Sequence, residues 1–186
     1  MPDRIANKII LAEDRMQQNL VRRYLEKCGH STRDLRLAPL PAQASGGSGE
    51  KYVRDHYAEQ VRACRSSKGK RASALLIVMI DADTKTTASR ASQLSDALDA
   101  AEEAALTAGE PVVVLIPKRN VETWIRALLG NPVDEISDYK KPAPTSNEIK
   151  RSATELYGRT RPGSELLDGY PPSLTRSIPE WQKIPS

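Results

Sequence analysis

The chain has 186 residues, of which 39% are hydrophobic and 28% are charged, and its formal net charge is +4. This length suits one domain with a single buried core and excludes two full domains. No apolar run approaches the ~20 residues that a membrane span needs, so we expect a cytoplasmic protein without a membrane partner. Cys28 and Cys64 lie outside any CxxC or Cys/His cluster and are predicted to be reduced packing residues.

The first 49 residues predict the start of a parallel βαβ unit. Residues 8–12 form a short apolar run that ends in Glu13, which is typical of a buried strand. Apolar residues then recur every three or four positions from 16 to 28, as on one face of a helix. Residues 31–37 are polar and predict an edge strand, and the Pro- and Gly-containing residues 39–49 predict a loop.

The middle of the chain continues the alternation of helix and strand. A helix is expected over 50–65, and the seven consecutive apolar residues 74–80 are the clearest buried strand in the sequence. An Ala-rich helix is predicted over 87–108, and the run PVVVLI at 111–116 predicts another buried strand. Asn120 is a good N-cap for the helix that follows.

This alternation predicts an α/β fold. Near-continuous apolar strands are typical of a parallel sheet covered on both faces, so we expect a Rossmann-like, mostly parallel four-stranded sheet with helices on both sides. Residues 1–130 would form this domain, with Trp124 in its core. Residues 131–186 would be a small helical extension packed on the core, with helices near 146–157 and 173–183.

Acidic residues follow the two best strands at the points where they end. Glu13 and Asp14 follow the first strand, and Asp81 and Asp83 follow the central one. The carboxyl ends of parallel strands meet at one edge of a sheet, where ligands bind in this class of fold. Glu122, in the first turn after the 111–116 strand, would lie at the same edge. Such acids repel one another without a cation, and their oxygens suit Mg²⁺ or Mn²⁺.

Each acid also has a simpler interpretation that the sequence leaves open. Asp83 could be the N-cap of the next helix, and Glu13 and Asp14 could stabilise the positive N-terminus of the first helix. Glu122 could do the same for its own helix and pair with Arg126 one turn later.

Two groups of basic residues predict phosphate-binding surfaces, with ordinary solvated charge as the alternative. The first group falls within ten residues and consists of Arg62, Arg65, Lys68, Lys70 and Arg71. The second is looser and consists of Lys118, Arg119, Lys140 and Lys141.

The opening KIILAEDRMQQNLVRRYLEKCGH resembles a response-regulator receiver domain. That resemblance implies that Glu13 and Asp14 bind Mg²⁺, that Asp81 is phosphorylated, and that Lys118 is the conserved late-strand lysine of the family. The spacing departs from the family, because a long loop and a helix separate the first helix from Asp81. In receivers the lysine precedes a proline, whereas here Pro117 precedes Lys118.

A second resemblance covers more of the chain, roughly residues 7–130. The pattern of IILAE ending at Glu13, a helix, and then LLIVMIDAD ending at Asp81 and Asp83 resembles Toprim domains. The continuation PVVVLIPKRNVETWIRALLG is similar to the strand and Glu-x-Trp helix of small stand-alone Toprim proteins near the RloB-like and OLD-type nucleases of bacterial defence. Asp14 stands where many Toprim proteins have glycine.

The Toprim resemblance implies a Mg²⁺- or Mn²⁺-dependent nuclease. Asp81 and Asp83 would hold the metal, Glu13 would act as general acid/base or as a further ligand, and Glu122 could complete the site. The basic residues 62–71, with Lys118 and Arg119, would then contact the nucleic-acid backbone.

The same resemblance implies an ATPase partner and a role in anti-phage defence. A homo-oligomer is left open. The alternatives are a non-catalytic Toprim-fold regulatory or binding subunit, and a receiver-like signalling domain phosphorylated on Asp81.

Overall fold

The protein is an α/β structure built on a four-stranded, all-parallel sheet. The computed structural model describes residues 5–40, 48–68, 73–164 and 168–186. The sheet consists of β1 (Ile5–Ala12), β2 (Leu35–Leu37), β3 (Ser73–Met79) and β4 (Val112–Leu115), in the order β2-β1-β3-β4. The predicted fold class, a Rossmann-like parallel sheet with helices on both faces, is therefore confirmed.

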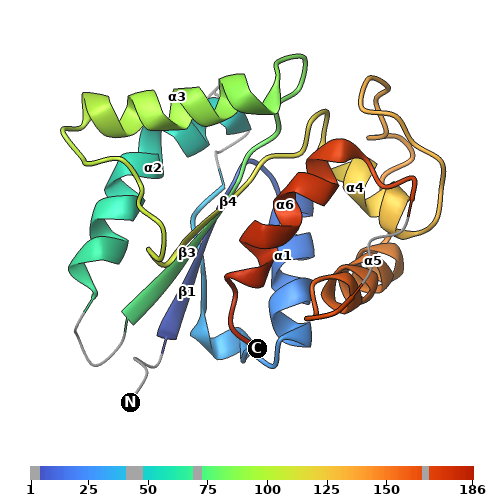
Figure 1. Cartoon of the computed structure of the whole chain (residues 1–186), viewed down its shortest axis with the longest axis horizontal. Helices are drawn as coiled ribbons and strands as arrows, with labels where there is room; N and C mark the ends of the chain where they lie inside the picture. Colours follow the sequence, from blue (N-terminus) through green and yellow to red (C-terminus); the bar gives the residue numbers. More distant parts are fainter. Residues whose placement is uncertain (1–4, 41–47, 69–72, 165–167) are drawn as a thin grey trace.

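In the described part of the chain, six α-helices form the two outer layers of the fold. They are α1 (Arg15–Lys27), α2 (Gly49–Ser66), α3 (Thr87–Ala100), α4 (Val121–Leu128), α5 (Ser146–Arg159) and α6 (Pro172–Gln182), and a short 3₁₀ helix spans Thr32–Asp34. Figure 1 shows α2 and α3 on one side of the sheet, and α1, α4, α5 and α6 on the other. Among the described helices, none is long and apolar enough to cross a membrane.

The two helix layers enclose two apolar cores because side chains of the strands alternate between the faces. Along β3, Leu75, Ile77 and Met79 pack against α1 and the C-terminal helices, whereas Leu76 and Val78 pack against α2 and α3. All seven residues of β3 are buried, as the uninterrupted apolar run predicts.

The C-terminal helices complete the first of these cores. Trp124 of α4 and Trp181 of α6 are both fully buried, and the ring of Tyr24 of α1 packs on Trp181 in a tilted arrangement with centroids 4.5 Å apart. Ala153 and Leu156 of α5 are also buried there. Residues beyond 131 thus share a core with α1 and α4. Cys28 and Cys64 are free and buried.

The predicted helix over 87–108 is too long. α3 ends at Ala100, and Glu102 has a left-handed φ of 57°. The backbone then leaves the helix because α2 holds it: Arg62 donates to the carbonyl of Ala101, and Arg65 donates to the carbonyls of two later residues. These contacts with α2 compete with the helical propensity of the Ala-rich sequence.

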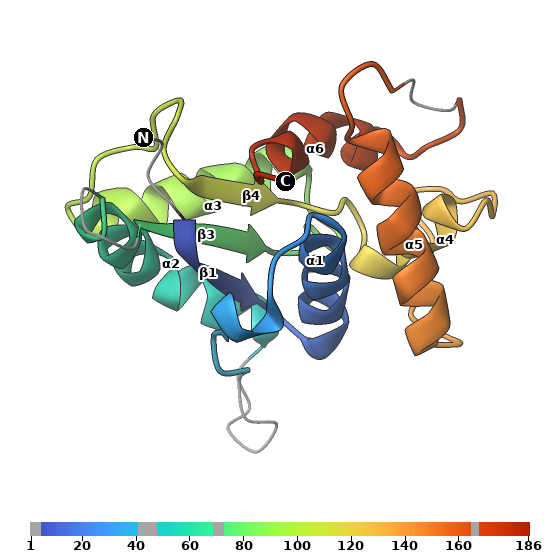
Figure 2. The same cartoon turned by 90° about the horizontal axis from the view of Figure 1, so that it is seen from below.

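The topology places the ends of β1 and β3 side by side. Ala12 is in register with Met79, so Glu13 and Asp81 leave neighbouring strands at the same edge. Figure 2 shows the strands pointing toward the side on which α4 and α5 lie.

Candidate functional site at the carboxyl edge of the sheet

Glu13 and Asp81 are joined across the two central strands. The Glu13 carboxylate accepts a hydrogen bond from the backbone N–H of Asp81, with Oε1 2.6 Å from the nitrogen. The backbone N–H of Glu13 in turn donates to the side chain of Gln17, at 3.0 Å. These two hydrogen bonds hold the residues that follow β1 and β3. Glu13 and Asp81 therefore lie next to each other, as the sequence predicts.

Asp81 is the most deeply buried acid of the group, with 2% of its surface exposed. Its Oδ1 is buried and has no hydrogen-bond partner among the described residues. Burial raises the pKa of Asp81 well above its ordinary value, and the negative charge of Glu13 raises it further. A buried carboxyl oxygen without a donor is uncommon in proteins and is one sign of a functional group.

The environment of Glu13 also disfavours its charged form. Burial raises its pKa, the hydrogen bond from Asp81 lowers it, and the charges of Asp83 and Asp14 raise it again, for a net value of about 7. Burial is thus the largest cause of the raised pKa of Glu13, and the carboxylates at this edge add to it because they outnumber the neighbouring cations.

Asp83 is turned away from the centre of this group. Its backbone is left-handed, with a φ of 52°, and its side chain is 44% exposed. One carboxylate oxygen lies 3.7 Å from the guanidinium of Arg90 on α3. The N-cap of α3 is Thr86, so Asp83 does not have the capping role that was one alternative for it.

Glu122 is buried on the first turn of α4, with 6% of its surface exposed. Its Oε2 lacks a hydrogen-bond partner among the described residues. Burial raises its pKa, and the charge of Asp14 adds to that rise. The alternative pairing with Arg126 is absent, because Arg126 pairs with Glu148 of α5 at 3.2 Å.

Two helix caps are present at the same edge, of which Asn120 was predicted as a cap and Asp14 only as a residue that stabilises the helix N-terminus. Asp14 is the N-cap of α1, and its carboxylate accepts from the N–H of Gln17 at 2.9 Å. Asn120 is the N-cap of α4 and accepts from the N–H of Thr123 at 3.1 Å. The simpler interpretation of Asp14 is therefore sufficient for that residue.

Two residues of the site, Gly49 and Arg90, were not predicted from the sequence. Gly49 begins α2 against the end of β1, and a Cβ on it would lie 2.5 Å from the carbonyl oxygen of Glu13. Arg90 is 1% exposed and donates to the backbone carbonyl of Asp81 at 2.8 Å and to the carboxylate of Glu50. Gly49 stood at the end of a loop and Arg90 in an Ala-rich helix, where neither residue type is unusual.

Lys140 belongs to the second basic group predicted from the sequence, and it lies near the acids. Desolvation lowers its pKa, but the carboxylates of Asp81, Asp83 and Glu122 raise it, and the net shift is upward. It therefore contributes positive charge to the acidic group from the segment between α4 and α5.

The acidic side chains are of the type that binds a hard cation, but they are not arranged as a complete binding site. Within the part of the chain that the structure describes, no three His, Cys, Asp or Glu side chains are close enough together to hold a metal ion. Oδ1 of Asp81 and Oε2 of Glu122 are nonetheless buried without donors, and both are the oxygen ligands that Mg²⁺ and Mn²⁺ prefer. Asp83 would have to leave Arg90 to join them.

The second basic group lies at this edge in part. Nζ of Lys118 donates to the carbonyl of Lys85 in the turn after β3, at 2.7 Å. Arg119 lies 3.9 Å from the carboxylate of Asp138. Together with Lys140, these residues put positive charge beside the acids.

The first basic group lies at the other end of the sheet. α2 starts beside Glu13 and spans 18 residues, so its C-terminus is roughly 27 Å away, next to the start of β3. There Cys64 donates to the carbonyl of Ala74, at 3.2 Å. Arg62 and Arg65 thus do not lie beside the acidic site, and the contact with nucleic acid predicted for them stays a prediction.

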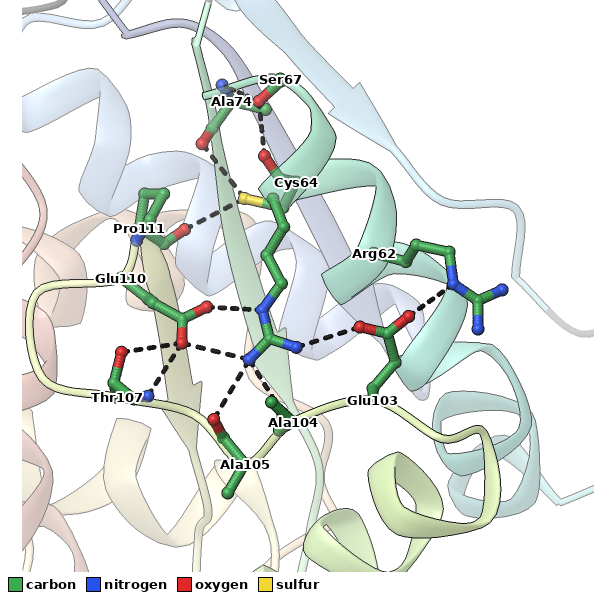
Figure 3. Close-up of polar contacts among 11 residues, drawn as sticks. Arg62, Cys64, Ser67, Ala74, Glu103, Ala104, Ala105, Thr107, Glu110 and Pro111 are labelled. Atoms are coloured by element: carbon green, nitrogen blue, oxygen red, sulfur yellow. Dashed lines mark hydrogen bonds and ion pairs between the residues drawn. The ribbon is translucent and has the colours of Figure 1, made fainter. Parts of the chain in front are cut away.

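Figure 3 shows the contacts that these two arginines make within the protein. Arg65 donates to both oxygens of Glu110, at 2.8 and 3.1 Å, and to Glu103 at 3.1 Å, while Arg62 donates to Glu103 at 2.5 Å. The hydrogen bonds from Arg65 lower the pKa of Glu110 to about 2. Lys68 is exposed beyond the end of α2, and Lys70 and Arg71 lie outside the described residues.

No protein-family model matches the chain, and no curated protein and no solved structure is significantly similar to it.

Proposed function

We propose that the protein is a Mg²⁺- or Mn²⁺-dependent nuclease of the Toprim type. The observation that carries this proposal is the pairing of Glu13 with Asp81 at the ends of adjacent parallel strands, with one buried oxygen of Asp81 that has no donor among the described residues. A structural role alone would leave that oxygen hydrogen-bonded, as buried polar groups usually are. The strand order supports the proposal, because it makes the acid-bearing strands neighbours.

The residues divide into those that would bind the cation and those that hold them. Asp81, Glu13 and Asp83 would ligate it, and Glu122 would border the site. When bound, the metal ion would neutralise charge on the scissile phosphate and activate water. Arg90 would hold the backbone of Asp81 in place through its carbonyl.

Nucleic acid is the proposed substrate class because positively charged residues surround the acids. Lys118, Arg119 and Lys140 lie at the same edge and could contact phosphates on either side of the scissile one. The ATPase partner and the role in anti-phage defence, which the Toprim resemblance implies, stay predictions.

One observation favours the alternative of a non-catalytic Toprim-fold subunit. Within the described residues no metal-binding group of three side chains is assembled, and Asp83 faces Arg90. A receiver-like phosphoacceptor has less support, because a carboxylate that receives a phosphoryl group must be reached by its donor, and Asp81 is 2% exposed.

A cleavage assay tests the proposal on plasmid, single-stranded DNA and tRNA, with Mg²⁺, Mn²⁺ or EDTA. Cleavage should require the metal and be lost in Asp81→Asn and Glu13→Gln proteins. Asp99→Asn is the matched control, since Asp99 is an exposed acid on α3. Equal cleavage by the Asp81→Asn protein would show a contaminating nuclease. Metal binding without cleavage of any substrate would favour the non-catalytic subunit.

A further inference from the structure

The open edge of β4 suggests a second binding surface, independent of the acidic site. β4 is the last strand in the sheet order, and no other described strand pairs with its outer side. The carbonyls of Pro111 and Leu115 accept from β3, so the backbone groups of Val112, Val114 and Ile116 point outward, although the N–H of Val112 already donates to the carbonyl of Glu110. Exposed edges of this kind are templates for another extended chain.

A groove runs along this edge between the two helix layers. Its volume is about 470 Å³. Val114 and Ile116 form its floor, Ala88 and Ala91 of α3 line one wall, and α6 lines the other. Figure 1 shows β4 between α3 and α6.

A side chain of α6 already occupies one hydrogen-bonding position on the outer edge of β4. Oε2 of Glu180, on α6, accepts a hydrogen bond from the outward N–H of Val114 at 3.0 Å. A neighbouring strand would present a backbone carbonyl at this place. The other oxygen of Glu180 is held by Lys183 at 2.5 Å, so the carboxylate keeps an ionic partner if the N–H of Val114 finds another acceptor.

The two sides of the groove differ in polarity. On the α3 side it joins an apolar pocket of about 280 Å³, with which it shares Ala91 and Val114, and which is lined further by Leu94, Leu98 and Leu106. On the α6 side it is lined by the hydroxyl-bearing residues Ser173 and Ser177 and by Arg176. An extended chain directs successive side chains to opposite faces, so alternate residues would enter these two environments.

We infer that this groove binds an extended segment of a partner polypeptide, which adds to the sheet as a fifth strand beside β4 and displaces Glu180. The segment has aliphatic side chains at alternate positions, for the apolar pocket, and small polar side chains between them. This is the general mode of strand addition at a sheet edge.

A second copy of this chain is a poor occupant on steric grounds. In each copy β4 lies between α3 and α6, whose side chains form the walls of the groove. The helices of two copies would collide before their β4 strands came within hydrogen-bonding distance, which is about 4.8 Å between strands. A single extended segment has no such obstacle.

The test uses the full chain and a fluorescein-labelled heptapeptide in which valine and threonine alternate, with binding measured by fluorescence anisotropy. Glu180→Ala should bind about tenfold more tightly than the unmodified protein, because a charge-assisted hydrogen bond no longer competes. Ala91→Arg should abolish binding by filling the groove. Ser92→Arg, on an exposed position of the same helix that does not line the groove, should leave binding unchanged.

A second measurement identifies the location of binding. In ¹⁵N-labelled Glu180→Ala protein, the amide of Val114 should exchange rapidly with solvent and become protected when the peptide binds. The proposal is overturned if the Ala91→Arg protein binds equally well, if a peptide with a central proline binds as tightly, or if Glu180→Ala shows no binding at 1 mM peptide. Dimerisation of Glu180→Ala in light scattering would make a second copy the occupant and would also overturn it.

Discussion

Replacing Glu13 with glutamine should stabilise the protein in metal-free solution at alkaline pH. The Glu13 carboxylate is drawn into a group of acids in which Asp81 is deeply buried, and its pKa is about 7 instead of the usual 4.5. Glutamine has nearly the same shape and keeps an oxygen that accepts from the N–H of Asp81. The substitution therefore removes a charge and leaves the packing in place.

The magnitude follows from the pKa of Glu13. Because its pKa in the folded protein is raised, the stability linked to it is fully present below pH 4.5 and is lost as the pH rises through about 7. At about 1.4 kcal/mol per pH unit, the loss amounts to about 3 kcal/mol by pH 8. Burying the glutamine amide offsets part of the gain, so we expect Glu13→Gln to be about 2 kcal/mol more stable at pH 8 and no more stable at pH 4.5.

Urea unfolding from pH 4.5 to 8.5 in EDTA measures this difference, with the fluorescence of the buried Trp124 and Trp181 as the probe. Asp99→Asn controls for general effects of net charge. A difference between the Glu13→Gln and unmodified proteins that does not change with pH would refute the electrostatic argument. Adding Mn²⁺ at pH 8 should raise the stability of the unmodified protein more than that of Glu13→Gln, since only the former keeps the full set of acids.

Two further substitutions test the contacts at the ends of α2. Gly49→Ala places a Cβ 2.5 Å from the carbonyl oxygen of Glu13 and should lower the free energy of unfolding by about 2 kcal/mol. Gly158→Ala is the control, because no atom lies within 4 Å of its new Cβ, and it should stabilise α5 by about 0.5–1 kcal/mol. Equal effects of the two substitutions on the melting temperature would contradict the close approach at Gly49. Arg65→Met should lower the free energy of unfolding by about 2 kcal/mol in chemical unfolding. It should also return the pKa of Glu110 from about 2 toward 4.5, which an NMR titration would detect. An unchanged pKa would show that another group stabilises that carboxylate.

The regular parts of the fold could be predicted because local pattern and tertiary burial agree in them. β3 is apolar at every position and is buried at every position. α1 carries its apolar residues at helical spacing and packs them in the core, and Gly29 after it has a left-handed φ of 85°. The end of α3 could not be predicted in this way, because Arg62 and Arg65, about 40 residues earlier in the chain, bind the carbonyls and carboxylates that follow Ala100.

The part of the acidic site that could be predicted is the part that follows from the order of the strands. Two acids that follow neighbouring parallel strands must lie at one edge, and Glu13 and Asp81 do. The orientation of Asp83 depends on Arg90, whose burial in an otherwise exposed stretch of helix has no local signature. In the sequence, the basic residues at the end of α2 suit phosphate and protein carboxylates equally. The contacts of Arg62 and Arg65 with Glu103 and Glu110 depend on tertiary structure and have no local signature.

The two ends of α2 show why the unpaired acids point to a ligand. At its C-terminal end, Arg65 binds both oxygens of Glu110 and also Glu103, so acids that come together there are neutralised within the protein. At its N-terminal end, Asp81 is more deeply buried than either of those glutamates, yet one of its oxygens has no donor among the described residues. The same chain thus supplies arginines where acids serve the fold. Arg90 donates to the backbone carbonyl of Asp81, but no arginine among the described residues binds its Oδ1, where we propose that a cation from solution completes the site.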